Sequence, residues 1–156
     1  MIQFEIPLRP MPKQALERFW HAKLKRPMVV RPRRVRQHAD AMASYMERHR
    51  PPEPMIGPVA LTVVFVWRAT AKCPVGFRIA PPDSDNCQKQ IKDCLQRCGF
   101  IENDAQVCKT IAWKRSGPRA GIFIRLERLA ESDWTEWKKG IKHGKEEQAG
   151  GAKGRE

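Results

Sequence analysis

Three aspartates and one lysine near the middle of the chain have the types and spacing that metal-dependent chemistry requires. Asp83 and Asp85 stand one residue apart where a helical pattern begins, and Lys89 follows one turn along the same helical face. Asp104 comes after the helix, where the chain turns back into a strand. We therefore expect the three carboxylates and the ammonium group to converge at one end of the helix. Oxygen ligands from separate segments are typical of a Mg²⁺ site, because Mg²⁺ takes few carboxylates and retains several waters.

An amphipathic helix that begins at Asp85 positions these groups. Its apolar residues recur with helical periodicity, which predicts a buried stripe of Cys87, Ile91, Cys94 and Cys98. Gly99 is expected to end the helix, because glycine readily adopts the left-handed conformation found at helix C-termini. The acids also have a purely structural interpretation, in which Asp85 and Gln88 form a capping box and Asp104 is a turn residue.

Several short motifs follow one another in order between residues 82 and 107. They are Pro82-Asp83-Ser84-Asp85-Asn86, Lys89, Asp93-x-Leu95, Gly99-Phe100 and Asn103-Asp104-x-Gln106-Val107. In order and spacing, this stretch resembles the core of the RusA-type Holliday junction resolvases, a family of crossover junction endodeoxyribonucleases. The resemblance implies that Asp83, Asp85 and Asp104 are catalytic, metal-binding carboxylates and that Lys89 is a catalytic lysine. One departure is Asn103, which stands where many relatives have an aspartate, so a supporting role of that aspartate does not carry over.

The chain has a formal net charge of +13, concentrated in its N-terminal third. Between Arg9 and Arg50, twelve lysines and arginines stand against three acids, a net of +9. This concentration is typical of a nucleic-acid-binding surface, although a solvated basic face without a partner has the same composition. The side chains expected to bind DNA are Arg9, Lys13, Lys23, Lys25, Arg26, Arg31, Arg33 and Arg34. Within this segment, Phe19-Trp20-His21 can stack on bases or anchor the loop to the core, and we favour anchoring.

Other kinds of site have little support in the sequence. The five cysteines and four histidines lack the spacing of a zinc site, so we interpret the cysteines as small buried apolar residues of a reduced protein. Neither a Gly-rich phosphate loop nor a Gly-x-Ser-x-Gly motif occurs. The chain has no apolar run long enough to span a membrane and no apolar signal-peptide core, so we expect a cytoplasmic protein without membrane contact.

Periodicity predicts one compact α+β domain with the element order β-α-β-α-β-β and helices on one face of a mixed sheet. Strands are expected at residues 2–8, 58–67, 105–114 and 121–128, and helices at 34–49 and 85–98. The Gly-Pro pair at 117–118 favours a hairpin between the last two strands, and residues 9–34 and 68–80 are expected to be loops. Residues 1–130 form the RusA-like domain in this interpretation. Residues 131–156 are a largely disordered tail after one last helical turn at Trp134 and Trp137.

These observations predict a Mg²⁺-dependent endodeoxyribonuclease that resolves four-way (Holliday) DNA junctions by phosphodiester hydrolysis in recombination and repair. Three carboxylates leave the number of ions open. A junction presents two strands related by near two-fold symmetry, and the family resemblance implies a dimer, so we expect a homodimer with one site for each strand. Two alternatives stay open. One is a non-catalytic basic nucleic-acid-binding protein, which needs no metal, and the other is a nuclease of broader activity on forks and flaps.

Overall fold

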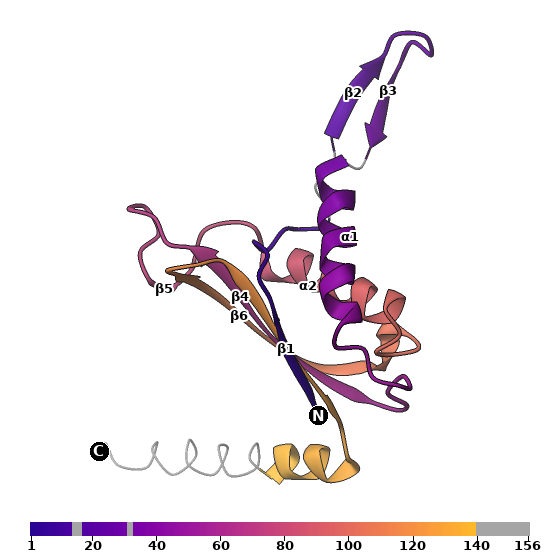
Figure 1. Ribbon diagram of the computed structural model, residues 1–156, viewed down its shortest axis with the longest axis vertical. Helices are drawn as coiled ribbons and strands as arrows, with labels where there is room; N and C mark the ends of the chain where they lie inside the picture. The colour runs from indigo at the N-terminus through magenta and orange to yellow at the C-terminus, as the bar shows by residue number, and fades with distance from the viewer. Residues whose placement is uncertain (14–16, 31–32, 140–156) are drawn as a thin grey trace, which may run out of the picture.

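The computed structural model describes residues 1–13, 17–30 and 33–139, in which two helices pack on a five-stranded mixed sheet and a hairpin projects from the body (Figure 1). The strands of this sheet are β1 (Ile2–Ile6), β4 (Val59–Arg68), β5 (Gly76–Phe77), β6 (Val107–Gly117) and β7 (Gly121–Arg128). The helices are α1 (Arg33–Glu47) and α2 (Ser84–Arg97), and a 3₁₀ turn, η1 (Asp104–Gln106), precedes β6. The hairpin consists of β2 (Glu17–His21) and β3 (Arg26–Val30).

The large sheet has the strand order β1-β7-β4-β6-β5, with β4 parallel to β6 and antiparallel to β7. The predicted α+β fold and its element order are confirmed, with β2, β3 and β5 as additional short strands. The predicted hairpin of the last two strands is wrong, because β4 lies between β6 and β7. The link at residues 118–120 crosses the end of β4. Two strand spacings amount to roughly 10 Å, which the four Cα–Cα steps from Gly117 to Gly121 easily span.

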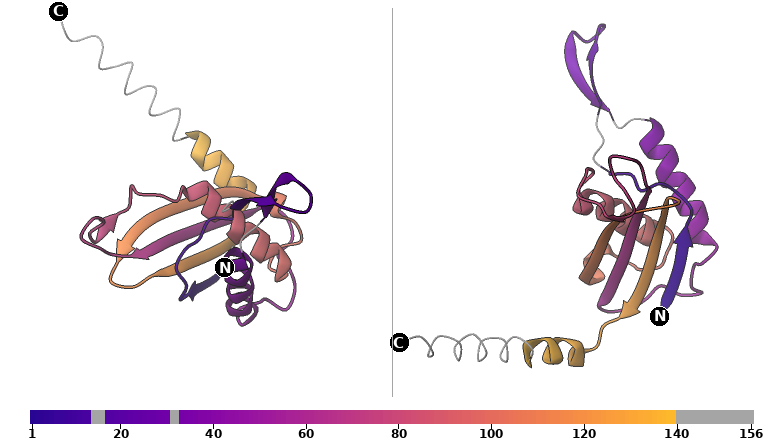
Figure 2. Two further views of the ribbon diagram at one scale, coloured as in Figure 1. Left: turned by 90° about the horizontal axis from the view of Figure 1, so that it is seen from above. Right: turned by 90° about the vertical axis from the view of Figure 1, so that its left-hand side faces the viewer.

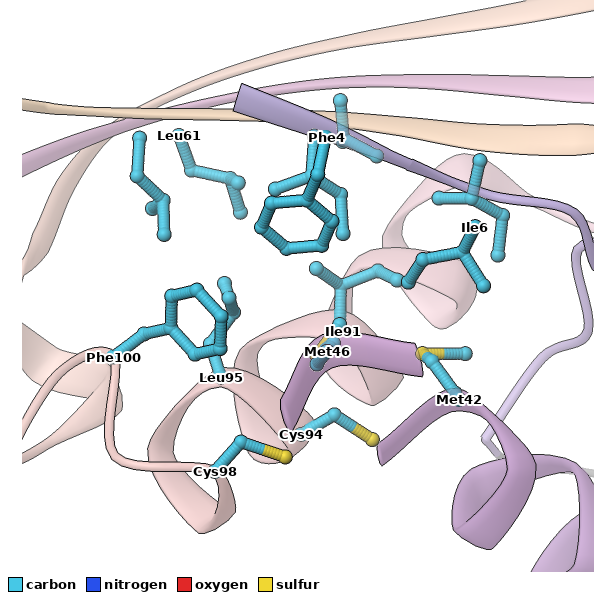
Figure 3. Close-up of a cluster of buried hydrophobic side chains, with 14 of the residues drawn as sticks. Phe4, Ile6, Met42, Met46, Leu61, Ile91, Cys94, Leu95, Cys98 and Phe100 are labelled. Carbon is cyan, nitrogen blue, oxygen red and sulfur yellow. The ribbon is translucent and has the colours of Figure 1, made fainter. Parts of the chain in front are cut away.

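The hydrophobic core lies between the sheet and the two helices, which cover the same face (Figure 3). α1 contributes Met42 and Met46, and α2 contributes the predicted stripe of Cys87, Ile91, Cys94 and Cys98, all of which are buried. Gly99 ends α2 as predicted, with a φ of +72°. The amide of Phe100 donates to the Leu95 carbonyl oxygen across this glycine, and this bond closes the C-terminal end of α2.

The β2–β3 hairpin replaces part of the predicted basic loop and projects beyond the N-terminal end of α1, away from the sheet (Figure 2). Frequent lysines, arginines and Pro27 hide the β-forming residues of this segment from a periodicity argument. Trp20 is 65% exposed, so the favoured interpretation that this aromatic anchors a loop to the core is wrong for Trp20.

Residues 131–139 form a helix after β7, which is longer than the single turn expected there. Trp134 and Trp137 stack on one another with ring centroids 4.9 Å apart. The rest of the predicted tail, residues 140–156, lies outside the described residues, and the division at residue 130 stays a prediction. Among the described helices, none has both the length and the apolar composition needed to cross a membrane.

Candidate active site

Asp83 and Asp85 are placed at the N-terminal end of α2, as the sequence predicts. Asp83 is the N-cap residue, but its side chain makes no capping hydrogen bond. The Gln88 amide nitrogen donates to the Ser84 hydroxyl at 2.9 Å, so the predicted Asp85–Gln88 capping box is not formed. Both carboxylates are exposed. They are therefore available to a ligand, and the positive end of the helix dipole favours anions at this position.

Lys89 stands one helical turn from Asp85, with its Nζ 3.9 Å from Asp85 Oδ2. Both side chains are more than half exposed, so this loose ion pair contributes little to stability. The lysine is instead available to an anion that approaches the same end of the helix. Asp83, Asp85 and Lys89 are thus brought together as expected.

Two basic residues that the sequence analysis did not single out hold the segment leading into Asp83. The Lys114 ammonium group, from β6, donates to the Ala80 carbonyl oxygen at 2.9 Å. The Arg78 guanidinium donates to the Pro81 carbonyl oxygen at 3.1 Å and lies over the Trp67 ring. Periodicity shows which face of a strand a lysine occupies but not which loop it contacts, so the contact of Lys114 with Ala80 becomes visible only in the structure.

The other predicted carboxylate, Asp104, is the first residue of η1, and its two neighbours in the motif build the turn. The Asn103 side chain accepts a hydrogen bond from the Ala105 amide at 2.8 Å, and Gln106 completes a capping box. Asn103 therefore caps the turn as an aspartate would. The Gln106 side chain also accepts from the Glu102 and Asn103 amides and donates to two carbonyl oxygens of the loop before β4. The Asp104 carboxylate is exposed and available to a ligand, while its backbone forms part of the turn, so its catalytic role stays a prediction.

Asp104 lies at the opposite end of α2 from Asp83, and the expected convergence within one chain is therefore wrong. The Asp104 amide donates to the side chain of Gln96, in the last turn of α2. The eleven residue steps from Asp85 to Gln96 extend over roughly 16 Å of helix. Along β6, the seven residue steps from Val107, which follows η1, to Lys114, which binds the segment before Asp83, extend over roughly 23 Å. The helix predicted at residues 85–98 already implies this separation, because Asp104 follows its C-terminal end.

The carboxylates have the oxygen donors that a hard divalent cation prefers, but too few of them lie together in one chain. Asp83 and Asp85 supply exposed oxygen donors without competing caps, which suits Mg²⁺. Within the described ranges, however, no three acidic, histidine or cysteine side chains are grouped closely enough to hold an ion. One chain thus presents a pair of carboxylates at one end of α2 and a third at the other end.

Most of the residues expected to bind DNA are exposed. Lys23, Lys25 and Arg26 are exposed at the tip of the β2–β3 hairpin, and Arg33 and Arg34 are exposed in the first turn of α1. Arg9 is also exposed, and its carbonyl oxygen accepts a hydrogen bond from His38. Lys13 differs, because its ammonium group pairs with Asp93 and its charge is partly neutralised. Arg31 lies outside the described residues.

The cysteines near α2 are structural, as predicted. Burial raises the pKa of Cys87 to about 11 and that of Cys94 to about 12, which keeps both thiols protonated at neutral pH. Cys108 is exposed, so the prediction of burial is wrong for this residue. Because the protonated thiol is a poor nucleophile, the thiols of α2 do not compete with the carboxylates as reactive groups.

Comparison with known proteins identifies the family. The model of the family described as endodeoxyribonuclease RusA matches residues 7–127, and this span contains both ends of α2. The chain belongs to this family, whose members are endodeoxyribonucleases that resolve Holliday junctions with the help of divalent metal ions. The predicted nuclease class and the branched DNA substrate are thereby confirmed. No curated protein gives a significant match.

Proposed function

We propose that this protein is a Mg²⁺-dependent Holliday junction resolvase in which Asp83, Asp85 and Asp104 hold the metal. The observation that carries the proposal is the pair of exposed, uncapped carboxylates beside Lys89 at the positive end of a helix. Oxygen donors of this kind select a hard cation, and Mg²⁺ is the one that retains waters for hydrolysis. Bound there, the ion would polarise the scissile phosphate and lower the pKa of a coordinated water.

The residues of the chain itself supply orientation and charge. Lys114 and Arg78 fix the backbone before Asp83, so the two carboxylates approach the DNA from a defined direction. The Lys89 ammonium group stabilises negative charge that develops on the phosphate, or positions the attacking water. The carboxylates alone would repel a phosphodiester, which is why this arrangement requires a cation between them.

We further propose a homodimer in which Asp104 of one copy completes the metal site of the other. The reason is that Asp83 and Asp104 lie at opposite ends of α2 in one chain. A two-fold axis that sets two α2 helices side by side and antiparallel would place each Asp104 near the Asp83–Asp85 pair of the second copy. Such a dimer carries two equivalent sites, which suits two symmetry-related cuts.

The basic hairpin and the first turn of α1 would bind the duplex arms through phosphates, without reading sequence. The non-catalytic alternative explains neither the uncapped carboxylates nor the family match. Broader activity on forks and flaps stays a possible extension of the same site. A cytoplasmic location also stays a prediction.

The test is cleavage of an end-labelled synthetic four-way junction in Mg²⁺, in Ca²⁺ and in EDTA. We expect symmetric cuts only with Mg²⁺ or a similar ion, and loss of cleavage with retained binding in Asp83→Asn, Asp85→Asn and Asp104→Asn. Asp93→Asn is the matched control, because Asp93 also lies on α2 but pairs with Lys13. Full cleavage in EDTA would refute the metal dependence, and normal cleavage by one Asp→Asn variant would remove that residue from the site.

A further inference from the structure

An exposed aromatic cluster lies on the edge of the sheet that is nearest to Asp83. Phe77 of β5 and Trp113 of β6 stack with ring centroids 6.1 Å apart and planes inclined by 26°. The Arg115 guanidinium lies 5.0 Å from the centre of the Phe77 ring. Phe77 is 69% exposed and Trp113 is 46% exposed, so two large rings face solvent where burial would be favourable.

The cluster and the carboxylate segment lie on opposite sides of the same two strands. Along β6, Trp113 and Arg115 are exposed, whereas Lys114 between them points towards the helices and binds the Ala80 carbonyl oxygen. Along β5, the residue after Phe77 is Arg78, which binds the Pro81 carbonyl oxygen. The hydrogen bonds of Lys114 and Arg78 therefore fix the distance between the aromatic rings and Asp83.

The charge around the cluster identifies the kind of partner. Residues 68–82 contain three basic residues and no acid, and β6 likewise contains three and no acid. A second copy seated on this surface through a two-fold axis would bring like charges together, which is unfavourable. A polyanion with aromatic faces of its own is complementary to both features.

We propose that the Phe77–Trp113–Arg115 cluster stacks on unpaired nucleobases at the branch point of the DNA junction. The inference rests on the proposed function and adds how the branch point is recognised. Bases at a branch point lose a stacking neighbour more easily than bases inside a duplex arm, and aromatic faces replace that neighbour regardless of sequence. Selection of branched over linear DNA would then come from this cluster, whereas the basic hairpin binds both alike.

The test compares the affinity for a four-way junction with that for a linear duplex of equal length, in EDTA, with 2-aminopurine at the branch point. In the double variant Phe77→Ala/Trp113→Ala, junction affinity should fall roughly fivefold to a hundredfold, the range for one or more lost stacking contacts. Duplex affinity should change less than about twofold by the same reasoning. The change in 2-aminopurine fluorescence on binding should disappear.

Two control variants separate stacking from other effects. Trp137→Ala removes a ring that is 57% exposed on the helix at residues 131–139, outside the cluster, and should leave both affinities unchanged. The conservative Trp113→Phe should retain most of the preference for the junction, because stacking needs only an aromatic face.

Three results would overturn the inference. They are an unchanged junction affinity, an equal loss for junction and duplex, and a changed molecular mass of the double variant in solution, which would mean that a second copy covers the cluster. A wild-type protein that does not prefer the junction would instead contradict the proposed function, and the inference would fall with it.

Discussion

Gln106 supports the strongest local prediction, because its side chain forms four hydrogen bonds that hold the turn carrying Asp104 against the loop before β4. Its Oε1 accepts hydrogen bonds from the Glu102 and Asn103 amides at 2.7 and 2.9 Å. Its Nε2 donates to the Met55 carbonyl oxygen at 2.9 Å and to a second carbonyl at 3.1 Å. Gln106→Ala removes all four. If each hydrogen bond contributes about 0.5–1.5 kcal/mol to the free energy of unfolding, the loss is about 2–6 kcal/mol. Because water reaches this half-buried site, we expect the lower end, about 2–3 kcal/mol.

The assay is urea denaturation of wild type, Gln106→Ala and Asn103→Asp, with junction cleavage measured on the same preparations. Gln106→Ala should unfold at lower urea with an unchanged slope and should cleave slowly, because Asp104 loses its support. Asn103→Asp keeps the oxygen that caps the turn and should match wild type within about 0.5 kcal/mol. A loss below about 0.5 kcal/mol for Gln106→Ala would refute the reasoning, because four intact hydrogen bonds cannot contribute so little together.

Three further predictions concern other parts of the molecule. Lys89→Ala should slow junction cleavage at least about tenfold with little change in affinity, because one phosphate contact among many contributes little to binding. If the cleavage rate and the affinity measured by gel shift fall by the same factor, Lys89 only binds DNA. Replacing Lys23, Lys25 and Arg26 together by Ala should flatten the slope of log affinity against log salt by up to about 2.7, and an unchanged slope would place the hairpin away from DNA. Burial lowers the pKa of His38, so its neutral form stabilises the fold above its ordinary pKa, and this contribution is lost as pH falls through the lowered pKa. The free energy of unfolding, measured between pH 8 and 5, should therefore fall less steeply in His38→Gln than in wild type. Parallel curves for the two proteins would contradict this role of His38.

Much of the fold follows from the sequence because its elements are strongly periodic. The stripe of α2 and the glycine at its end specify which face is buried and where the helix stops. β4 is apolar on both faces, which marks it as the central strand. The neighbour relations of β6 and β7 could not be predicted, because a short link is compatible both with a hairpin and with a crossing over β4.

The candidate site was predictable in its residue types but not in its geometry. The helical spacing places Lys89 beside Asp85, and the structure has this pair. The helix predicted at residues 85–98 already separates Asp85 from Asp104 along its length, so the expected convergence of these two acids is inconsistent with the predicted helix. The contacts of Lys114 and Arg78 with the segment before Asp83 depend on strand register, which long-range pairing determines.

Subunit mixing tests the central claim, a site shared between two copies, most directly. Asp83→Asn and Asp104→Asn proteins, each inactive alone, are mixed in equal amounts, allowed to exchange subunits, and assayed for cuts in a four-way junction with Mg²⁺. In a shared site, each mixed dimer contains one site with both aspartates intact, so about a quarter of the wild-type sites return when half of the dimers are mixed. A mixture of Asp83→Asn with Asp85→Asn is the matched control and should stay inactive, because both changes lie at the same end of α2. Recovery only in the first mixture is the predicted result, and inactivity of both mixtures would contradict the shared site.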